Sequence, residues 1–357
     1  MVDTTIPHSQ PWIARDELRA AADVLRSGQL AQGSCVEQFE RGLAAFVGRR
    51  GGVAVTSGTV ALELALRALH IGPGDEVILP SYVCAAPWLA IQHVGADACL
   101  VDIDRETFNI DPRHVREVVT GKTRAIIVPH LFGLPADLTE LQAIGVPLIE
   151  DCAQTLGALE RGRHVGMVGT LTVCSFYATK LLCTGEGGMV LSDNEALLER
   201  VRALRQYDEE PSLDPAASNY KMTDLQAAIG LCQLRRLPSF LSRRQEIAVA
   251  YQGALAGTQV VCPWVPPGRT HVYYRFVVQV AEPLASNETV PPLIARLERA
   301  EVQCRRPVFR PIHSYLKMDG YPNSELAYQR ALSIPLYPSL TEEAVTQITT
   351  VLREELA

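Results

Sequence analysis

The sequence predicts an α/β fold in which a mainly parallel seven-stranded sheet lies between helices, followed by a smaller C-terminal α+β domain. Seven short apolar runs alternate with helical segments up to about residue 192. Beyond about residue 234 the pattern changes to a charged helix, one strand and a terminal helix. The length of 357 residues also exceeds what a single core usually supports. We therefore predict a large domain at 1–235, which includes the N-terminal segment, and a small domain at 236–357.

Each strand candidate is short and apolar, and most contain Val or Ile. The seven runs cover residues 52–56, 76–79, 98–102, 125–129, 147–150, 171–177 and 188–192. They show no polar alternation, which is typical of strands buried on both faces of a mainly parallel sheet. After the first run, Ala61, Leu62, Ala65 and Leu69 follow helical spacing.

The small domain is predicted from a charged helix at 243–256, a strand at 272–280 and a terminal helix from Thr341 onward. The uncharged stretch 77–96 is long enough for a membrane helix, but its prolines and glycine favour a strand, a turn and a buried helix. We expect no membrane span.

Composition excludes some classes of function. The net charge is −7 and no long basic run occurs, which argues against nucleic-acid binding. The nine cysteines are scattered singly, without metal-type pairs, and are typical of reduced thiols. The N-terminus lacks the pattern of a signal peptide. We expect a cytoplasmic protein without a metal site.

Three groups of residues at predicted strand ends could carry chemistry. Ser57-Gly58-Thr59 stands between a strand and a helix, where free N–H groups attract a phosphate. Taken alone, this tripeptide is better explained by Ser57 or Thr59 as a plain helix cap. Asp151 ends a buried strand, where ligands bind in such sheets, and it could hold a protonated pyridine nitrogen while Gln154 binds a phenolic oxygen. A helix cap is the alternative for Asp151 as well.

Lys180 closes the run Ser175-Phe176-Tyr177-Ala178-Thr179-Lys180, which is mostly apolar. Burial disfavours the ammonium form of a lysine and frees its amine to attack an aldehyde. Taken alone, a lysine at a strand end is usually a solvated charge. Together, the phosphate cradle, the acid and the lysine match what pyridoxal phosphate (PLP) requires.

The sequence resembles the DegT/DnrJ/StrS sugar aminotransferases, which have the fold type I architecture of PLP-dependent transferases. The resemblance covers residues 28–354. It is carried by Thr56-Ser57-Gly58-Thr59, Gly74-Asp75-Glu76-Val77, Val101-Asp102-Ile103-Asp104, Pro129-His130-Leu131-Phe132-Gly133, Ile149-Glu150-Asp151-Cys152-Ala153-Gln154, the run that ends at Lys180, Gly185-Glu186-Gly187-Gly188, Asn219-Tyr220-Lys221-Met222-Thr223 and Pro311-Ile312-His313.

The resemblance implies a role for each matching residue. Lys180 forms the internal aldimine with PLP, Asp151 binds the pyridine nitrogen, Gln154 binds the ring oxygen and Ala153 packs on the ring. The phosphate is held by Ser57, Gly58, Thr59 and Ser175, and by Asn219 of the partner subunit. The active unit implied is thus a homodimer with shared sites. For the substrate, Lys221, Arg310 and His313 are the candidates.

One departure concerns the ring of the cofactor. Many relatives place an aromatic residue after the strand end at Pro80-Ser81, where this chain has Val83, Cys84 and Ala85. Either Tyr82 or Trp88 could take the place of that aromatic residue against the cofactor ring.

The implied reaction is a ping-pong transfer from glutamate or glutamine to a nucleotide-linked ketosugar, with PLP passing through pyridoxamine phosphate (PMP). One alternative is a sugar dehydratase of the same family, but those members typically have histidine where this chain has Lys180. A desulfurase-like use of Cys304 is disfavoured because no histidine immediately precedes Lys180, where Thr179 stands. A non-catalytic regulatory protein with this fold remains the third alternative.

Overall fold

The computed structural model describes residues 5–207, 214–280 and 290–355, and its largest element is the seven-stranded sheet that the sequence predicts. The strands are β1 (Gly51–Val55), β2 (Glu76–Pro80), β3 (Asp97–Val101), β4 (Thr123–Pro129), β5 (Leu148–Asp151), β8 (Leu171–Ser175) and β9 (Gly188–Ser192). Their order is β1-β9-β8-β5-β4-β2-β3. Only β9 runs antiparallel to its neighbours, β1 and β8. The mainly parallel sheet is confirmed.

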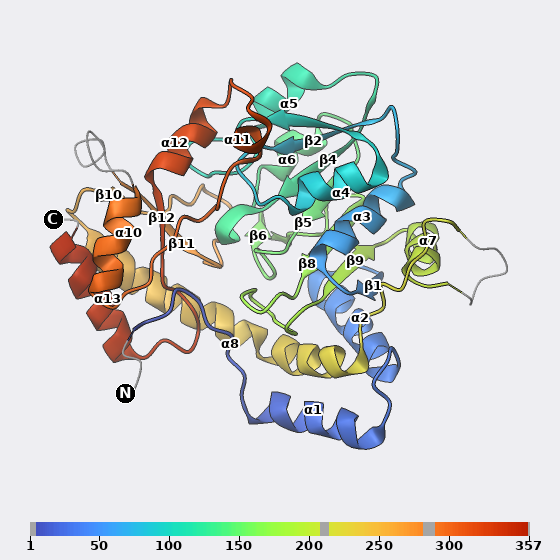
Figure 1. Ribbon diagram of the computed structural model, residues 1–357, viewed down its shortest axis with the longest axis horizontal. Coiled ribbons are helices and arrows are strands. Elements are labelled where there is room, and N and C mark those ends of the chain that lie inside the picture. The colour runs from blue at the N-terminus through green and yellow to red at the C-terminus, as the bar shows by residue number, and fades with distance from the viewer. Residues whose placement is uncertain (1–4, 208–213, 281–289, 356–357) are drawn as a thin grey trace.

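Helices cover both faces of this sheet (Figure 1). They are α2 (Ser34–Val47), α3 (Gly58–Ala68), α4 (Ala86–Val94), α5 (Pro112–Val118), α6 (Leu138–Gln142), α7 (Glu195–Arg205) and α8 (Asp224–Leu255), whereas α1 (Arg15–Ser27) packs against α8. Successive strand residues point to opposite faces, so Val53 and Val55 pack in the cluster of α3 whereas Ala54 packs in the cluster of α2. The strand β1 is therefore buried on both sides.

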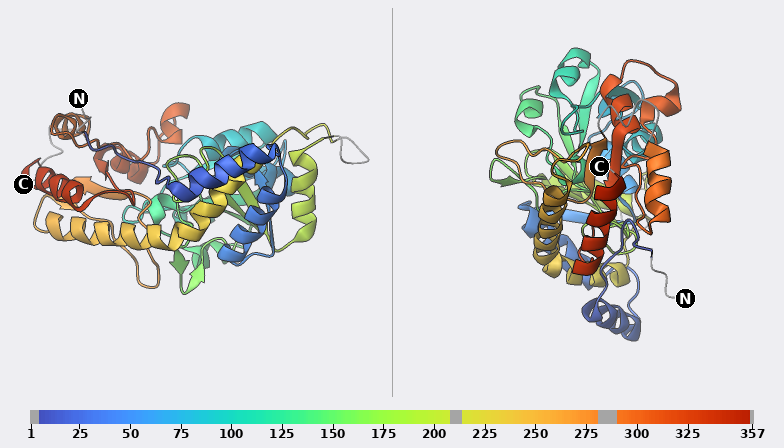
Figure 2. Two further views of the ribbon diagram at one scale, coloured as in Figure 1. Left: turned by 90° about the horizontal axis from the view of Figure 1, so that it is seen from below. Right: turned by 90° about the vertical axis from the view of Figure 1, so that its left-hand side faces the viewer.

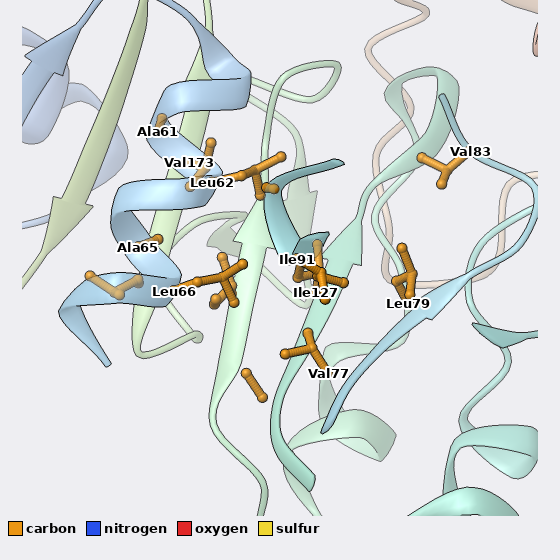
Figure 3. Close-up of a cluster of buried hydrophobic side chains, with 14 of the residues drawn as sticks. Ala61, Leu62, Ala65, Leu66, Val77, Leu79, Val83, Ile91, Ile127 and Val173 are labelled. Atoms are coloured by element: carbon orange, nitrogen blue, oxygen red, sulfur yellow. The ribbon is translucent and has the colours of Figure 1, made fainter. Parts of the chain in front are cut away.

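The contact between α3 and the sheet is one continuous apolar layer. Figure 3 shows Ala61, Leu62 and Leu66 of α3 beside Val173 and Ile127, which project from the strands. All five side chains belong to one cluster of buried residues. This packing fixes the position of the α3 N-terminus relative to the ends of the strands.

The second, smaller sheet has the order β10-β11-β12 and lies at the other end of the molecule (Figures 1 and 2). Its strands are β10 (Val260–Val261), β11 (Phe276–Val280) and β12 (Ala331–Ile334), and its helices are α10 (Val290–Arg299), α11 (Ile312–Leu316), α12 (Pro322–Arg330) and α13 (Glu342–Glu355). The short pair β6 (Leu159–Glu160) and β7 (Arg163–His164) and the 3₁₀ turn η1 (Leu131–Gly133) complete the described elements.

Most strands of the large sheet differ from their predicted bounds by one or two residues, and two elements of the C-terminal part differ more. The charged helix expected at 243–256 is the end of α8, which starts at Asp224 and continues past Pro238. The strand expected at 272–280 is β11, which begins only at Phe276. Residues before it pair with the η1 turn instead, because Val272 N–H donates to the Gly133 carbonyl at 2.9 Å.

The helix α8 crosses the predicted boundary at 235/236 without a break, and its second half packs with β11, β12, α10 and α13. Ile6 of the N-terminal segment also packs in this second cluster. The division into 1–235 and 236–357 itself stays a prediction. Over the described part of the chain, none of the helices combines the length and the apolar character that crossing a membrane requires.

Candidate active site

The predicted site residues come together at the carboxyl edge of the large sheet. Asp151 ends β5 and Ser175 ends the adjacent parallel strand β8. Lys180 lies five residues after the end of β8. Its charge lowers the pKa of Asp151, whereas burial raises that pKa. Ser57 follows β1, which points the same way as β8. The shared edge exists because parallel strands end on one side of a sheet.

The start of α3 forms a cradle for an anion. Ser57 caps the helix, since its hydroxyl accepts from the Val60 N–H at 3.2 Å, so the capping interpretation holds for this residue. Gly58 opens the helix against β8, and a Cβ atom on Gly58 would lie 2.7 Å from the Ser175 Cβ. The absence of a side chain lets the first N–H groups of the helix and the Ser175 hydroxyl face one point. A phosphate fits there.

Asp151 is a half-buried acid whose pKa is shifted from its usual value. Burial raises its pKa, while the Ala153 N–H, 3.0 Å from Oδ1, and the charges of Lys180 and His130 act in the opposite direction. The net pKa is raised. Such a carboxyl is stabilised by a cationic N–H partner, which a protonated pyridine nitrogen supplies.

Glu150, the residue before Asp151, anchors the end of β5 through its buried carboxylate. Its carboxylate accepts N–H groups of Gly166 and Val168 at 2.7 and 2.8 Å and lies 3.2 Å from His130 Nε2. Burial alone would raise the pKa of Glu150, but His130 and the backbone donors lower it below its usual value. The ligand atoms of His130, Glu150 and Cys152 lie within 4.8 Å of one another. Because Glu150 is already saturated with donors, we interpret this group as structural.

Gln154 lines the cavity described below, and the oxygen of its side-chain amide is already hydrogen-bonded within the fold. Its Oε1 accepts from the Phe132 N–H at 2.8 Å. The amide NH₂ group is thus directed elsewhere and can donate to a phenolic oxygen. Ala153 stands between Asp151 and Gln154, and its packing on the ring stays a prediction.

Tyr274 is the main residue near Lys180 that sequence reasoning missed. Lys180 Nζ lies 5.1 Å from the centroid of the Tyr274 ring, and Thr179 Oγ1 lies 3.4 Å from its hydroxyl. Burial alone would raise the pKa of Tyr274, but Lys180 and Arg275 outweigh it and lower the pKa to about 8. Nothing in the local sequence predicts this contact, because Tyr274 stands in a segment predicted only as strand.

A cavity of about 900 Å³ adjoins these residues, a size typical of ligand sites. Cys84 and Gln154 line one side of it. The cationic lining consists of Arg275, Arg305, Arg306 and Arg310, against one carboxylate from Glu298. Since the whole chain has a net charge of −7, this local excess of arginine indicates an anionic ligand.

The predicted substrate residues differ in their placement. Arg310 lines the cavity. His313 is buried, with Nδ1 2.5 Å from Ser81 Oγ and Nε2 2.6 Å from Glu325 Oε1. Both ring nitrogens are therefore engaged within the fold, and this geometry does not support His313 as a ligand contact. Its role is to join α11 to the end of β2.

Asn219 and Lys221, the two predicted residues that follow α7, lie near the end of β1, the strand that leads into the phosphate cradle. Lys221 forms an isolated bridge with Val55, and the Tyr220 carbonyl accepts from the Thr56 N–H at 2.9 Å. The side chain of Asn219 is exposed. Contacts of Lys221 with substrate and of Asn219 of the partner subunit with phosphate stay predictions.

Tyr82 and Trp88, the two candidates for an aromatic residue that stacks on the cofactor ring, do not line the cavity. Tyr82 is fully buried, 6.0 Å from the ring of Phe108, and its hydroxyl donates to the Ala327 carbonyl at 3.4 Å. Trp88 packs against the apolar cluster of α3. Cys84 instead lines the cavity and interacts electrostatically with Lys180 and Asp151. A thiol thus occupies the side of the site where an aromatic ring was expected.

Comparison with known proteins identifies the cofactor. The chain is 37% identical to the spore coat polysaccharide biosynthesis protein SpsC of Bacillus subtilis, over 98% of this chain and 96% of that protein. It is 33% identical to the GDP-perosamine synthase of Caulobacter vibrioides, over 91% of each. The solved PLP form of Spr1654 from Streptococcus pneumoniae superposes with a TM-score of 0.91 at 27% identity, covering 99% of this chain and 100% of that one.

Spr1654 has also been solved in a PMP form. The cradle at Gly58, the half-buried acid and the adjacent lysine fit this cofactor in its two states, so the protein is an enzyme that uses PLP and PMP. Residues 11–353 match one family over nearly the whole chain. The chain belongs to the DegT/DnrJ/EryC1/StrS aminotransferase family.

Proposed function

We propose that this enzyme moves an amino group from glutamate or glutamine to the keto group of a nucleotide-linked ketosugar, in two successive half-reactions. The observation that carries the proposal is that Lys180 acts electrostatically on Asp151, near Gln154, which lines a large cavity together with four arginines and one carboxylate. A nucleotide sugar carries a diphosphate, and arginine is the side chain best suited to bind it. The names of the two sequence relatives support an acceptor from sugar metabolism.

When bound, PLP supplies an electron sink for the carbon that loses its proton. Lys180 holds the cofactor before the donor enters and, once released, moves the proton at the α-carbon of the substrate. Asp151 keeps the pyridine nitrogen protonated, and Gln154 donates to the ring oxygen. Ser57, Gly58, Thr59 and Ser175 hold the phosphate at the start of α3. Arg306 and Arg310 are placed to bind the diphosphate of the acceptor.

We also propose that the active unit is a homodimer in the cytoplasm. The helix α1 exposes Leu18 and Leu25, with exposed fractions of 65% and 58%, seven residues apart on one face. Such a face favours burial against a second copy. Asn219 is exposed, as a residue that reaches into a neighbouring site must be. All nine cysteines are free thiols, which is typical of a reducing compartment.

The half-reactions can be tested separately. Added glutamate should convert the absorbance of bound PLP to that of PMP and release 2-oxoglutarate. A panel of nucleotide ketosugars, added to the PMP form, should restore the PLP absorbance for the true acceptor and yield an aminosugar. Loss of a hydroxyl from the sugar without gain of nitrogen would instead identify the dehydratase alternative. No response to any amino donor would refute transfer.

A further inference from the structure

The aromatic face of Tyr274 lies beside the amine of Lys180. Lys180 Nζ stands 5.1 Å from the centroid of this ring, within the distance at which an aromatic face attracts a cation. Tyr274 is buried, with only 6% of its surface exposed. Because little water competes there, the ring attracts a cation more strongly than it would at an exposed site.

The ring also has little room to turn away from Lys180. Together with Arg275, Lys180 lowers the pKa of Tyr274 to about 8, although burial alone would raise that pKa. Thr179 Oγ1 lies 3.4 Å from the Tyr274 hydroxyl. The residual space beside the ring amounts to about 10 Å³, about what one water molecule needs. The side chain is therefore held by its surroundings.

The backbone of Tyr274 is fixed from two sides. Its carbonyl accepts from Nη1 of the buried Arg244 at 3.1 Å. The N–H of the following residue donates to the Phe132 carbonyl at 3.1 Å, and the Phe132 N–H donates to Gln154 Oε1 at 2.8 Å. This approach is close because Gly133 has no side chain, and a Cβ there would lie 2.7 Å from the Tyr274 nitrogen. The ring is therefore held relative to the carboxyl edge of the large sheet.

The other surroundings of Lys180 do not fix its amine. In 5–207, 214–280 and 290–355 no ion pair joins Lys180 to a carboxylate, although Asp151 lies near enough for an electrostatic effect. The side chain of lysine has a flexible four-carbon stem, so an amine without a fixed partner samples many positions. A ring face favours an ammonium group and a protonated imine alike, since both carry a positive charge.

We propose that the ring face of Tyr274 holds the amine of Lys180 in the position from which it bonds to PLP, so that Tyr274 is a positioning residue; this inference rests on the proposed function. In that step the amine attacks the aldehyde carbon, the C–N bond forms and the aldehyde oxygen leaves as water. The amino donor later displaces Lys180, and the released amine returns to the same ring. The effect belongs to the aromatic face and not to the hydroxyl.

Stopped-flow absorbance of cofactor-free enzyme mixed with increasing PLP separates two quantities. The concentration dependence gives the dissociation constant of the initial non-covalent complex, and the plateau gives the limiting rate at which the link to Lys180 forms. Tyr274→Leu and Tyr274→Met remove the ring and should lower the limiting rate at least about tenfold, because the amine is no longer oriented. Their dissociation constant should stay at the wild-type value. Tyr274→Phe keeps the ring and should keep the wild-type rate.

Tyr273→Leu is the matched control, because it removes a ring of the same size from the adjacent residue. Tyr273 is also buried, and its ring stacks on His271 with 4.1 Å between the centroids. The limiting rate of this variant should equal that of wild type. A wild-type rate in either variant that lacks the Tyr274 ring, or an equal loss in Tyr273→Leu, would overturn the assignment.

The Lys180→Ala background shows whether the ring acts through the lysine. There, adding Tyr274→Leu should leave the affinity for PLP unchanged. A further loss would show that the ring binds the cofactor itself, and it would also overturn the assignment. If instead wild-type enzyme forms no covalent link at Lys180, the proposed function fails, and the two failures are thereby distinguished.

Discussion

Gly58 and Ser175 meet where the first turn of α3 touches the end of β8, and a Cβ atom on Gly58 would lie only 2.7 Å from the Ser175 Cβ. This separation is well below van der Waals contact, so the two elements can approach only because position 58 has no side chain. The contact brings the N–H groups of a helix start and a hydroxyl to one point. It is the geometric basis of the phosphate cradle.

Gly58→Ala should therefore weaken PLP binding by about tenfold or more, because the added methyl group must push the helix start away from Ser175. The dissociation constant of PLP, measured from its absorbance on titration, checks this. Gly253→Ala is a suitable control, since a Cβ at Gly253 in α8 would meet nothing within 4 Å. That variant should keep wild-type PLP affinity and gain up to about 1 kcal/mol in stability.

Tyr274 should titrate as an acidic tyrosine in cofactor-free protein. Its pKa in the fold is about 8, below the ordinary value of 10.0. Folding thus favours the phenolate, and the resulting stability is fully present above about pH 10 and is lost as pH falls through about 8. The free energy of unfolding of wild type minus that of Tyr274→Phe should rise by about 2–3 kcal/mol between these pH values.

Urea unfolding of both proteins at the two pH values measures that difference, and tyrosinate absorbance reports the titration directly. A difference that stays constant with pH would show that Lys180 and Arg275 do not act on this phenol.

Glu150→Ala should destabilise the cofactor-free protein by about 3–5 kcal/mol, since it leaves the buried His130 Nε2 and several buried N–H groups without their acceptor. Glu246→Ala removes an exposed partner of Arg243 and should cost less than about 1 kcal/mol. Denaturant unfolding of the two variants compares them. Equal losses would argue against the anchoring role of Glu150.

Cys84 should be the first thiol to react with a small alkylating reagent in cofactor-free protein. Among the nine cysteines, all of which lie in the described part of the chain, it alone has an exposed side chain. Burial on binding should protect it, so PLP is expected to slow its modification at least about tenfold. Mass spectrometry of timed samples locates the label. Equal rates with and without PLP would place Cys84 away from the cofactor.

The strands of the large sheet could be predicted because each is a short apolar run buried on both faces, as Val53, Ala54 and Val55 illustrate. The start of α8 at Asp224 could not be predicted, because Pro238 lies inside this helix and a proline usually marks the end of a helix. Asp151 and Lys180 were found because strand ends meet at one edge of a parallel sheet.

Other parts of the site depend on contacts between distant segments, which local sequence does not encode. His8 reaches Arg275 across the fold, and Tyr274 reaches Lys180 from the smaller sheet's side. His313 was expected to contact the substrate because of its match to the family, yet Ser81 and a carboxylate from α12 engage both of its ring nitrogens.

The central claim is that Lys180 is the residue that carries PLP. Borohydride reduction of the PLP-loaded enzyme, followed by peptide mapping, tests it most directly because reduction makes the link between lysine and cofactor permanent. We expect one phosphopyridoxyl label, on Lys180, and none in Lys180→Ala protein that still binds PLP. A label on another lysine, or equal labelling of the variant, would contradict it.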